Sequence, residues 1–338
     1  GKKISRENKN IDLRFKKLIK WLSKNDMSNY QDIRIASSDA SFRRYFRVTY
    51  EKESYIVMDA PPDKENCSTF IQAAKIFSKM EINVPKLIKT SSDEGFILMT
   101  DFGSDQYLDL LNSNVSGNYN LYKDAINTLL NMQNKGKDYQ EMFSPYSESL
   151  IRKEMKLFFD WFLNHHHGYQ LSKSETESWL DCSHILTQNA LSQPQVLVHR
   201  DYHSRNLMFL DSNNPGILDF QDAVIGPITY DLVSLLRDCY VSLKPDVVSD
   251  FSLYFYKNLD EEDKAGISLN QFTKFFDLMG IQRHLKAIGI FTRLNYRDGK
   301  SIYLDDIPRT LNYILTVAEK YPEINFLVKL IKKVKFTG

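Results

Sequence analysis

The spacing of apolar residues changes repeatedly along the first hundred positions. Ile11–Lys24 carries apolar residues at the spacing of an amphipathic helix, and Asn66–Lys79 does so again. Residues 33–60 contain three short runs typical of strands, IRIA, RRYFRVTY and SYIVMDA. Two further strand-like runs, VPKLIKT and GFILMTDF, flank the turn SSDEG. The pattern predicts an N-terminal lobe over residues 1–105, with a leading helix, a mainly antiparallel five-stranded sheet and one further helix.

Beyond Tyr107 the pattern is mostly helical, which predicts a C-terminal lobe over residues 106–338. The segment between the two lobes, residues 99–106, is expected to be a hinge. The expected helices cover about 121–135, 146–164, 173–191, 228–241, 246–258, 269–295 and 306–320. The polar stretch NSNVSGNYN at 112–120 reads as a loop.

One segment interrupts the helices and carries the strongest chemical signal. Residues 196–222, VLVHRDYHSRNLMFLDSNNPGILDFQD, read as three short strands around a polar loop at 199–206. Asp201 is followed five positions later by Asn206 and thirteen positions after that by Asp219. Protein kinases use this order, with a carboxylate base and then two oxygen ligands for Mg²⁺. A plain hairpin with turn-forming Asp and Asn is the alternative, but the three together favour phosphoryl transfer from ATP.

This segment and the preceding strands together predict an α+β fold of the two-lobed protein-kinase type. An Asp-Phe-Gly sequence at 101–103 resembles the kinase magnesium motif, but it precedes the catalytic loop in the chain. We therefore expect it to be part of the hinge, where Met99, Asp101 and Phe102 would contact the nucleotide. The magnesium carboxylate is then expected at Asp219.

The expected phosphate-binding loop, Ser37–Ser41, contains no glycine. A tight polar hairpin is the alternative to a phosphate site there. The usual kinase lysine is missing, because the third strand ends Met58-Asp59, and the helix 66–79 has no glutamate to pair with one. We expect an arginine of the second strand, most plainly Arg44, to neutralise phosphate instead. The candidate nucleotide contacts in this region are Ser38, Ser41, Arg43, Arg44 and Arg47.

A basic group near residue 283 suggests the chemistry of the acceptor. Arg283 and Lys286 are three positions apart on an expected helix and share a face. A cationic face suits a carboxylate, whereas a polycation would need an acidic cleft. An ordinary solvated helix face is the alternative. The candidate substrate contacts are His203, Arg205, Gln221, Arg283 and His284.

Composition excludes several other classes of function. The chain has 338 residues, 42% of them apolar and 26% charged, and a net charge of +1. This balance gives no support for binding to nucleic acid. The three cysteines are far apart, which indicates buried thiols in a reducing, cytoplasmic setting. No apolar run reaches the ~18–20 residues that span a bilayer. No obligate protein partner or membrane association is expected.

Longer motifs give the chain a family resemblance. HRDYHSRN, LDFQDA and GPITYDLVSLL resemble the aminoglycoside phosphotransferase branch of the kinase fold. SDASFRRYFRV, YIVMDAPP, QRHLKAIGIFTRL and RDGKSIYLDDIPRTLNYI are similar to the cell-wall-recycling kinases, which phosphorylate the anomeric hydroxyl of N-acetylmuramate and N-acetylglucosamine. The resemblance implies ATP and Mg²⁺ as cofactors, Asp201 as base, and Asn206 and Asp219 as metal ligands. It also implies that a buried Asp231 braces the catalytic loop.

Two other interpretations remain open at this point. One is a kinase of a different small molecule, such as an aminoglycoside, choline or another alcohol. The other is a nucleotide-binding pseudokinase that acts as a scaffold, since both members of the usual lysine–glutamate pair are missing.

Overall fold

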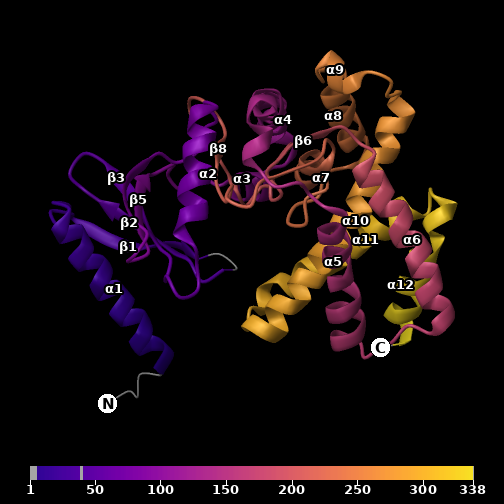
Figure 1. Ribbon diagram of the computed structural model, residues 1–338, viewed down its shortest axis with the longest axis horizontal. Coiled ribbons are helices and arrows are strands. Elements are labelled where there is room, and N and C mark those ends of the chain that lie inside the picture. Colours follow the sequence, from indigo (N-terminus) through magenta and orange to yellow (C-terminus); the bar gives the residue numbers. More distant parts are fainter. Residues whose placement is uncertain (1–5, 39–40, 338) are drawn as a thin grey trace. The chain divides into compact units, whose positions relative to one another are not determined.

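The chain forms two compact units in the computed structural model, which describes residues 6–38 and 41–337 (Figure 1). The first unit contains Gly1–Ser104 together with Gly216–Gln221, and the second contains Asp105–Pro215 and Asp222–Gly338. The predicted division placed residues 216–221 with the large lobe, whereas in the structure they belong to the first unit. None of the described helices is both long enough and apolar enough to cross a membrane.

The first unit is built on the predicted five-stranded antiparallel sheet, with strand order β1-β2-β3-β5-β4. Helix α2 begins where the side chain of Asn66 accepts the backbone N–H of Ser68, a typical N-cap. The strands are β1 (Asp32–Ser38), β2 (Arg44–Thr49), β3 (Ser54–Asp59), β4 (Leu87–Ser91) and β5 (Phe96–Thr100), and the helices are α1 (Arg6–Lys24) and α2 (Cys67–Lys79).

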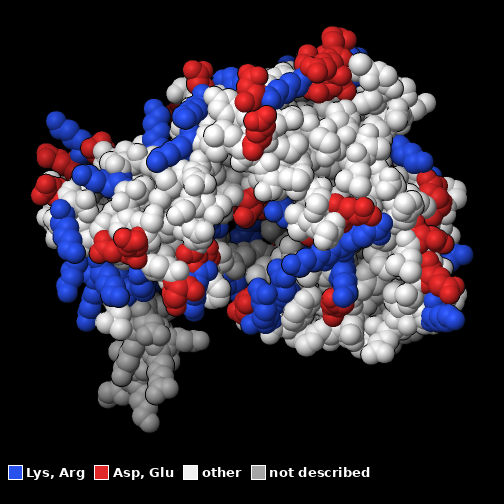
Figure 2. Space-filling view, viewed as in Figure 1, with Lys and Arg blue, Asp and Glu red and all other residues white. Residues whose placement is uncertain are grey.

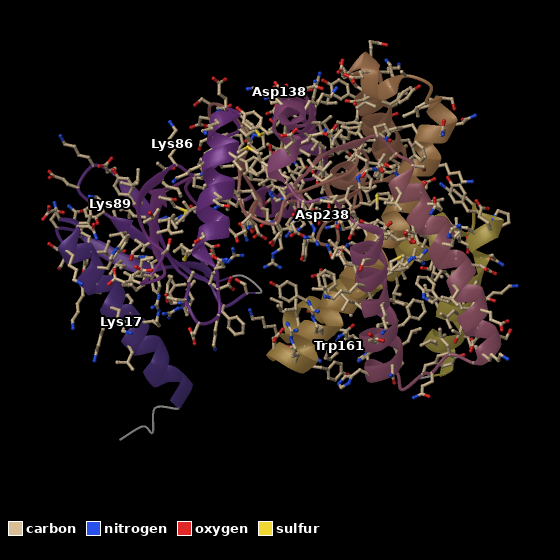
Figure 3. All side chains as sticks on the ribbon, viewed as in Figure 1. Lys17, Lys86, Lys89, Asp138, Trp161 and Asp238 are labelled. Atoms are coloured by element: carbon tan, nitrogen blue, oxygen red, sulfur yellow. The ribbon has the colours of Figure 1, made fainter. Side chains whose placement is uncertain are left out.

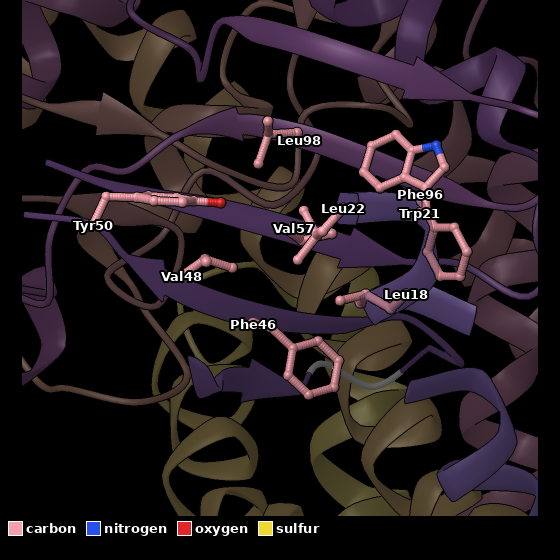
Figure 4. Close-up of a cluster of buried hydrophobic side chains, with 9 residues drawn as sticks. All are labelled: Leu18, Trp21, Leu22, Phe46, Val48, Tyr50, Val57, Phe96 and Leu98. Carbon is pink, nitrogen blue, oxygen red and sulfur yellow. The ribbon is translucent and has the colours of Figure 1, made fainter. Parts of the chain in front are cut away.

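A buried apolar cluster joins α1 to one face of this sheet (Figure 4). Its side chains are at most 9% exposed, so removal of apolar area from water stabilises the unit at roughly 25 cal/mol per Å². The cluster consists of Leu18, Trp21, Leu22, Phe46, Val48, Tyr50, Val57, Phe96 and Leu98.

Helix α2 anchors the segment 216–221 to the same unit. The ring of Phe220 lies 5.1 Å from that of Phe70 and 5.6 Å from that of Phe77, centroid to centroid. The backbone N–H of Ile217 also donates to the carbonyl of Asn83 at 2.8 Å. These contacts are the physical reason why Asp219 belongs to the first unit, although it is far from the unit in sequence.

The second unit is mainly helical, as predicted. Its long central helix α10 begins at a Ser268 cap and ends before Gly299, whose φ of 68° suits a glycine at a helix end. Its helices are α3 (Tyr107–Ser113), α4 (Tyr119–Gly136), α5 (Glu148–Leu157), a π-helix (Phe158–His166), α6 (Lys173–Leu191), α7 (Tyr230–Leu236), α8 (Pro245–Lys257), α9 (Glu261–Lys264), α10 (Leu269–Asp298), α11 (Ile307–Ala318) and α12 (Asn325–Thr337). Strands β6 (Gln195–Val198) and β9 (Val224–Pro227) pair antiparallel.

Several predicted elements of this unit need correction. The helix expected over 228–241 ends at Leu236, because Asp238 uses its carboxylate to bind backbone N–H groups of non-helical segments. Helices α3 and α12 were not predicted as separate elements, and the expected loop 112–120 contains the end of α3 and the start of α4. Cys67, Cys182 and Cys239 are buried free thiols, as predicted.

Candidate active site

The loop after β6 folds back on the carboxylate-bearing residue Asp201. The backbone N–H of Asp201 donates to Nδ1 of His199 at 3.0 Å. The carbonyl of Asp201 accepts the backbone N–H of His203 at 3.0 Å and Nδ2 of Asn206 at 2.9 Å. Arg200 has a φ of 87°, an uncommon backbone conformation for a side-chain-bearing residue and one that recurs at functional sites.

Two buried aspartates hold this loop in place. The carboxylate of Asp231 accepts the backbone N–H groups of His199 at 2.7 Å and Arg200 at 3.0 Å. Asp238, labelled in Figure 3, accepts the backbone N–H of Ser204 at 2.9 Å. Burial raises the pKa of Asp231, against the lowering effect of His199 and the two N–H groups. Each carboxylate satisfies backbone donors that would otherwise be buried without a partner.

A cavity of the second unit opens on Asp201. Arg283 and Lys286 both line it, so the predicted shared face of these two residues is present. It is not a solvated surface, because Arg283 is buried and the side chain of Lys286 is only 12% exposed. The lining residues are Asp201, His203, Tyr230, Cys239, Tyr240, Arg283, Lys286, Ala287, Ile290 and Phe291.

A buried glutamate connects the catalytic loop to the basic wall of the cavity. Glu154, from α5, lies 2.7 Å from the guanidinium of Arg200 and 3.0 Å from Nζ of Lys286. It also accepts a short hydrogen bond from the hydroxyl of Tyr146. Burial would raise the pKa of Glu154, but the charges of Lys286 and Arg200 outweigh it and hold that pKa below its usual value. Glu154 is therefore a carboxylate that fixes two cations.

The electrostatic surroundings favour the ionised form of Asp201. Burial works to raise its pKa, but the positive charge of Lys286, with smaller effects from His203 and Arg283, lowers the pKa overall. Desolvation lowers the pKa of His203 to about 4, so this imidazole is neutral near pH 7. An ionised carboxylate beside a neutral histidine can accept a proton from a bound hydroxyl.

Two polar atoms of the cavity wall have no hydrogen-bond partner among the described residues. They are Nδ1 of His203 and Nε of Arg283, both in side chains less than a tenth exposed. Buried polar atoms are normally paired, so these two mark positions where a ligand would be bound.

The structure places the other predicted substrate contacts elsewhere. His284 is 1% exposed, its Nε2 lies 3.0 Å from the carbonyl of Arg237, and its ring stacks on Tyr313. It does not belong to the cavity wall, because adjacent residues of a helix point in different directions. Gln221 donates to Asp219 in the first unit at 2.6 Å.

Arg205 also has an aromatic environment of its own. Its guanidinium lies 4.9 Å from the ring centroid of Tyr240 and 5.1 Å from that of Tyr303. Its carbonyl accepts Nε2 of Gln106 at 2.7 Å. Arg205 therefore contacts Tyr240, which lines the cavity, but Arg205 itself does not line it.

In the first unit, Asp219 is paired with Arg43. Nη2 of Arg43 lies 3.3 Å from Oδ1 of Asp219, and the φ of Asp219 is 54°. Ser41 Oγ accepts Nε of Arg43 at 3.0 Å. Asp39 and Ala40 lie outside the described residues, as does the side chain of Ser38, so only part of the expected phosphate loop is described.

The arginine that the sequence favoured for phosphate has another role. Arg44 lies 2.8 Å from Asp59, and Arg14 of α1 lies 2.6 Å from the same carboxylate. Asp59 is 1% exposed, and the two arginines supply the hydrogen bonds that its buried carboxylate oxygens require. Arg44 is thus an internal ion-pair residue, and Arg43 is the arginine placed next to the expected metal carboxylate.

The carboxylate of Asp101 accepts several hydrogen bonds from residues of its own unit. Its carboxylate accepts Nε of Arg47 at 2.7 Å, Oγ of Ser54 at 2.7 Å and the backbone N–H of Gly103 at 2.8 Å. Burial would raise the pKa of Asp101, but these donors lower it overall. These contacts suit a structural carboxylate better than a magnesium ligand. Met99 is buried in β5, and Phe102 packs against Gly216, where a side chain would collide with its ring.

Each unit contains one predicted magnesium ligand whose oxygen atoms are of the kind that bind Mg²⁺. Because Nδ2 of Asn206 donates to the Asp201 carbonyl, its amide oxygen is left as the acceptor. Asp219 keeps a carboxylate that is 29% exposed. Amide and carboxylate oxygens are the ligands Mg²⁺ prefers.

Two other polar groups have structural contacts. The acidic patch at α9 pairs with Lys137, whose Nζ lies 2.5 Å from Asp260 and 3.1 Å from Asp263 (Figure 2). Of the His165–His167 run, His166 contacts the hydroxyl of Tyr296. In the described part of the chain, no group of three or more His, Cys, Asp or Glu side chains is placed to hold a metal ion.

The sequence analysis missed four residues of the site, namely Glu154, Tyr230, Asp238 and Tyr240. Only one signal pointed to any of them: Glu154 is an acidic residue on the otherwise apolar face of its helix, beside Ile151 and Met155. The contacts of the others depend on long-range packing.

The chain is similar to several curated kinases. The chain is 38% identical to an N-acetylmuramate/N-acetylglucosamine kinase of Pseudomonas putida, over 96% of this chain and 97% of the relative. It is 41% identical to the kinase of the same name from Pseudomonas aeruginosa, over 88% and 86%. A Neisseria meningitidis kinase of that name is 37% identical over 93% and 94%.

Solved structures share the fold at low sequence identity. A Plasmodium vivax ethanolamine kinase superposes with a TM-score of 0.61 at 13% identity, covering 97% of this chain and 93% of the other. An ADP-bound aminoglycoside phosphotransferase, APH(2'')-Ib, gives 0.55 at 14%, covering 87% and 96%. These confirm the kinase-like fold predicted from the sequence. Residues 32–256 match the family described as "Phosphotransferase enzyme family". The chain is therefore a member of that phosphotransferase family.

Proposed function

We propose that this protein transfers the γ-phosphoryl group of ATP to the anomeric hydroxyl of N-acetylmuramate or N-acetylglucosamine, as a step in cell-wall recycling. The single observation that carries the proposal is the partly buried carboxylate of Asp201 in a cavity with a basic wall, whose positive charges lower the pKa of that carboxylate. The names of relatives at 37–41% identity support the choice of sugars.

In this reaction Asp201 acts as the general base. The sugar hydroxyl forms a bond to the γ-phosphorus, the bond from that phosphorus to the β,γ-bridging oxygen breaks, and ADP leaves with the electron pair. Asp201 accepts the hydroxyl proton as this occurs. An anomeric hydroxyl is more acidic than an ordinary alcohol, so a single carboxylate is a sufficient base. The hydrogen bonds of Asp231 and Asp238 keep the loop from moving during the step.

Asn206 and Asp219 are the proposed magnesium ligands. Magnesium, when bound, neutralises the phosphate charge and draws electron density from the group being transferred. Arg43 supplies a positive charge next to Asp219, in place of the lysine that the third strand lacks. The remaining predicted nucleotide contacts are Ser38, Ser41 and Arg47, with Met99, Asp101 and Phe102 at the hinge. The side chains of Arg47 and Asp101 are paired with each other, so these two residues would contact the nucleotide through their backbone atoms.

The charge of the cavity favours these sugars over other acceptors. Aminoglycosides, choline and ethanolamine are cations, and the side chains of Arg283 and Lys286 on the cavity wall would repel them. A braced catalytic loop with an ionised base is also the arrangement expected of an active enzyme rather than a scaffold.

A substrate panel tests the proposal. Purified protein with ATP and MgCl₂ is offered N-acetylmuramate, N-acetylglucosamine, glucose, choline and kanamycin, and ADP formation is measured. The expected result is rapid turnover of the two N-acetylated sugars. Asp201→Asn should lower this turnover by at least about 10³-fold while nucleotide still binds. The control is Asp250→Asn, on the exposed face of α8, which should match the wild type. Turnover of choline or kanamycin with neither sugar phosphorylated would overturn the proposal.

A further inference from the structure

Arg283 is a buried cation that forms no ion pair with a carboxylate of the described residues, although the charges of Asp201 and Asp238 act on it. Its side chain is 7% exposed, and its Nε has no hydrogen-bond partner among the residues described. Its side-chain contacts are weak: Nη1 lies 3.8 Å from Sγ of Cys239, and the guanidinium carbon lies 6.0 Å from the ring centroid of Tyr230. Burying a guanidinium without a carboxylate partner is energetically unfavourable.

The neighbouring cations are each ion-paired with a carboxylate, which makes Arg283 different from them. Arg200 and Lys286 both bind the carboxylate of Glu154, at 2.7 and 3.0 Å. Arg237, at the end of α7, lies 2.8 Å from Asp277. These three partly buried cations have carboxylate partners, whereas the more deeply buried Arg283 has none among the described residues, which leaves Arg283 suited to a ligand.

The position of Arg283 specifies where that ligand would be. Arg283 lines the same cavity as Asp201, the proposed base, and the planar guanidinium can donate two parallel hydrogen bonds to one carboxylate. Three apolar residues of α10, Ala287, Ile290 and Phe291, line the cavity too. A carboxylate with a methyl group beside it, as in a lactyl ether, matches a wall that is cationic at one point and apolar next to it.

We propose that Arg283 binds the lactyl carboxylate of N-acetylmuramate and so sets the preference of the enzyme for acidic over neutral amino sugars. The inference rests on the proposed function, because it takes Asp201 and the anomeric hydroxyl as given. The same guanidinium chemistry would also suit the phosphoryl group in transfer, and the experiment distinguishes these two sources of negative charge.

The test compares kcat/KM for three substrates: N-acetylmuramate, the same sugar with its lactyl carboxyl converted to an amide, and N-acetylglucosamine. For Arg283→Met, kcat/KM on N-acetylmuramate should fall by at least about 30-fold, since a partner of a buried charge pair is lost. On the amide and on N-acetylglucosamine it should stay within about threefold of wild type. Arg297→Met is the matched control, because Arg297 is an exposed arginine on the same helix that pairs with Asp298.

A second, more conservative variant keeps the test informative if Arg283→Met fails to fold. Arg283→Lys keeps the charge but loses the planar fork, and it should lower kcat/KM on N-acetylmuramate about tenfold with little change on N-acetylglucosamine. Equal losses on all three substrates in either variant would overturn the inference and indicate a contact to the phosphoryl group. A wild-type enzyme that does not distinguish N-acetylmuramate from its amide would overturn it as well. Failure of the wild type to phosphorylate any of the three sugars would instead refute the proposed function.

Discussion

Arg43 lies 3.3 Å from the carboxylate of Asp219, whereas Arg44, the next residue, lies 2.8 Å from Asp59. The two arginines therefore differ in what their removal should do. Arg43→Gln should raise the KM for ATP at least about tenfold, because a positive charge beside the proposed metal ligand is lost. Arg44→Gln should leave that KM within about threefold of wild type and lower Tm, because Asp59 loses one of its two partners. Steady-state kinetics over a range of ATP, with thermal melts, measure both. The assignment would be wrong if Arg44→Gln raised the KM and Arg43→Gln did not.

Asp101 and Asp219 provide a second pair of contrasting carboxylates. Asp219→Asn should abolish the dependence of nucleotide affinity on MgCl₂, because it removes the anionic ligand. Asp101→Asn should keep that dependence and destabilise the first unit by about 1–3 kcal/mol, through weakened bonds to Arg47, Ser54 and the Gly103 amide. Calorimetric ATP titrations with and without MgCl₂, and urea unfolding, report the two effects. Loss of magnesium dependence in Asp101→Asn would show that the Asp-Phe-Gly sequence has a metal role after all.

Asp231 should matter to both stability and catalysis. Asp231→Ala leaves two buried backbone N–H groups without acceptors, which costs about 2–6 kcal/mol of folding free energy at roughly 1–3 kcal/mol for each. Because those groups belong to His199 and Arg200, kcat should also fall by at least about 100-fold. Urea unfolding and initial rates on the same preparation give both numbers, with Asp250→Ala as the control. A variant that is as stable as the wild type would contradict the bracing role.

The buried histidine His284 predicts a dependence of stability on pH. Burial, assisted by the charge of Arg283, lowers its pKa to about 3, against about 6.5 in an unfolded chain. Between these values the unfolded state binds more protons, so His284 contributes stability that is fully present above about pH 6.5 and is lost as the pH falls towards 3. The slope it contributes is at most about 1.4 kcal/mol per pH unit. His284→Gln should therefore show a shallower fall of unfolding free energy between pH 7.5 and pH 5. Parallel curves for the two proteins would show that His284 is not held neutral.

Local sequence patterns were sufficient to predict the two-lobed architecture. The five strands and most helices were predicted because apolar spacing distinguishes a strand from a helix over short windows. The helix expected through 228–241 was wrong because the carboxylate of Asp238 accepts the backbone N–H groups of Ser204 and Tyr240. The contact with Ser204 is long-range and leaves no local pattern.

The candidate site was predictable only as far as its motifs extend. The order Asp201, Asn206, Asp219 identified the chemistry, since those residue types are required at that spacing. The choice between Arg43 and Arg44 depended on where Asp59 and Asp219 lie, because both arginines are compatible with the sequence. Likewise, the position of His284 away from the cavity and the contact of Glu154 with Lys286 follow from helix packing, which brings α5 next to α10.

Phosphorus NMR of the product tests the central claim most directly. Wild-type protein is incubated with ATP, MgCl₂ and N-acetylmuramate, and the product is examined for coupling between ³¹P and the anomeric proton. The account predicts one new phosphate monoester coupled to that proton, present with the wild type and absent with Asp201→Asn. A phosphate on another carbon of the sugar, or ADP formation without any sugar phosphate, would contradict it.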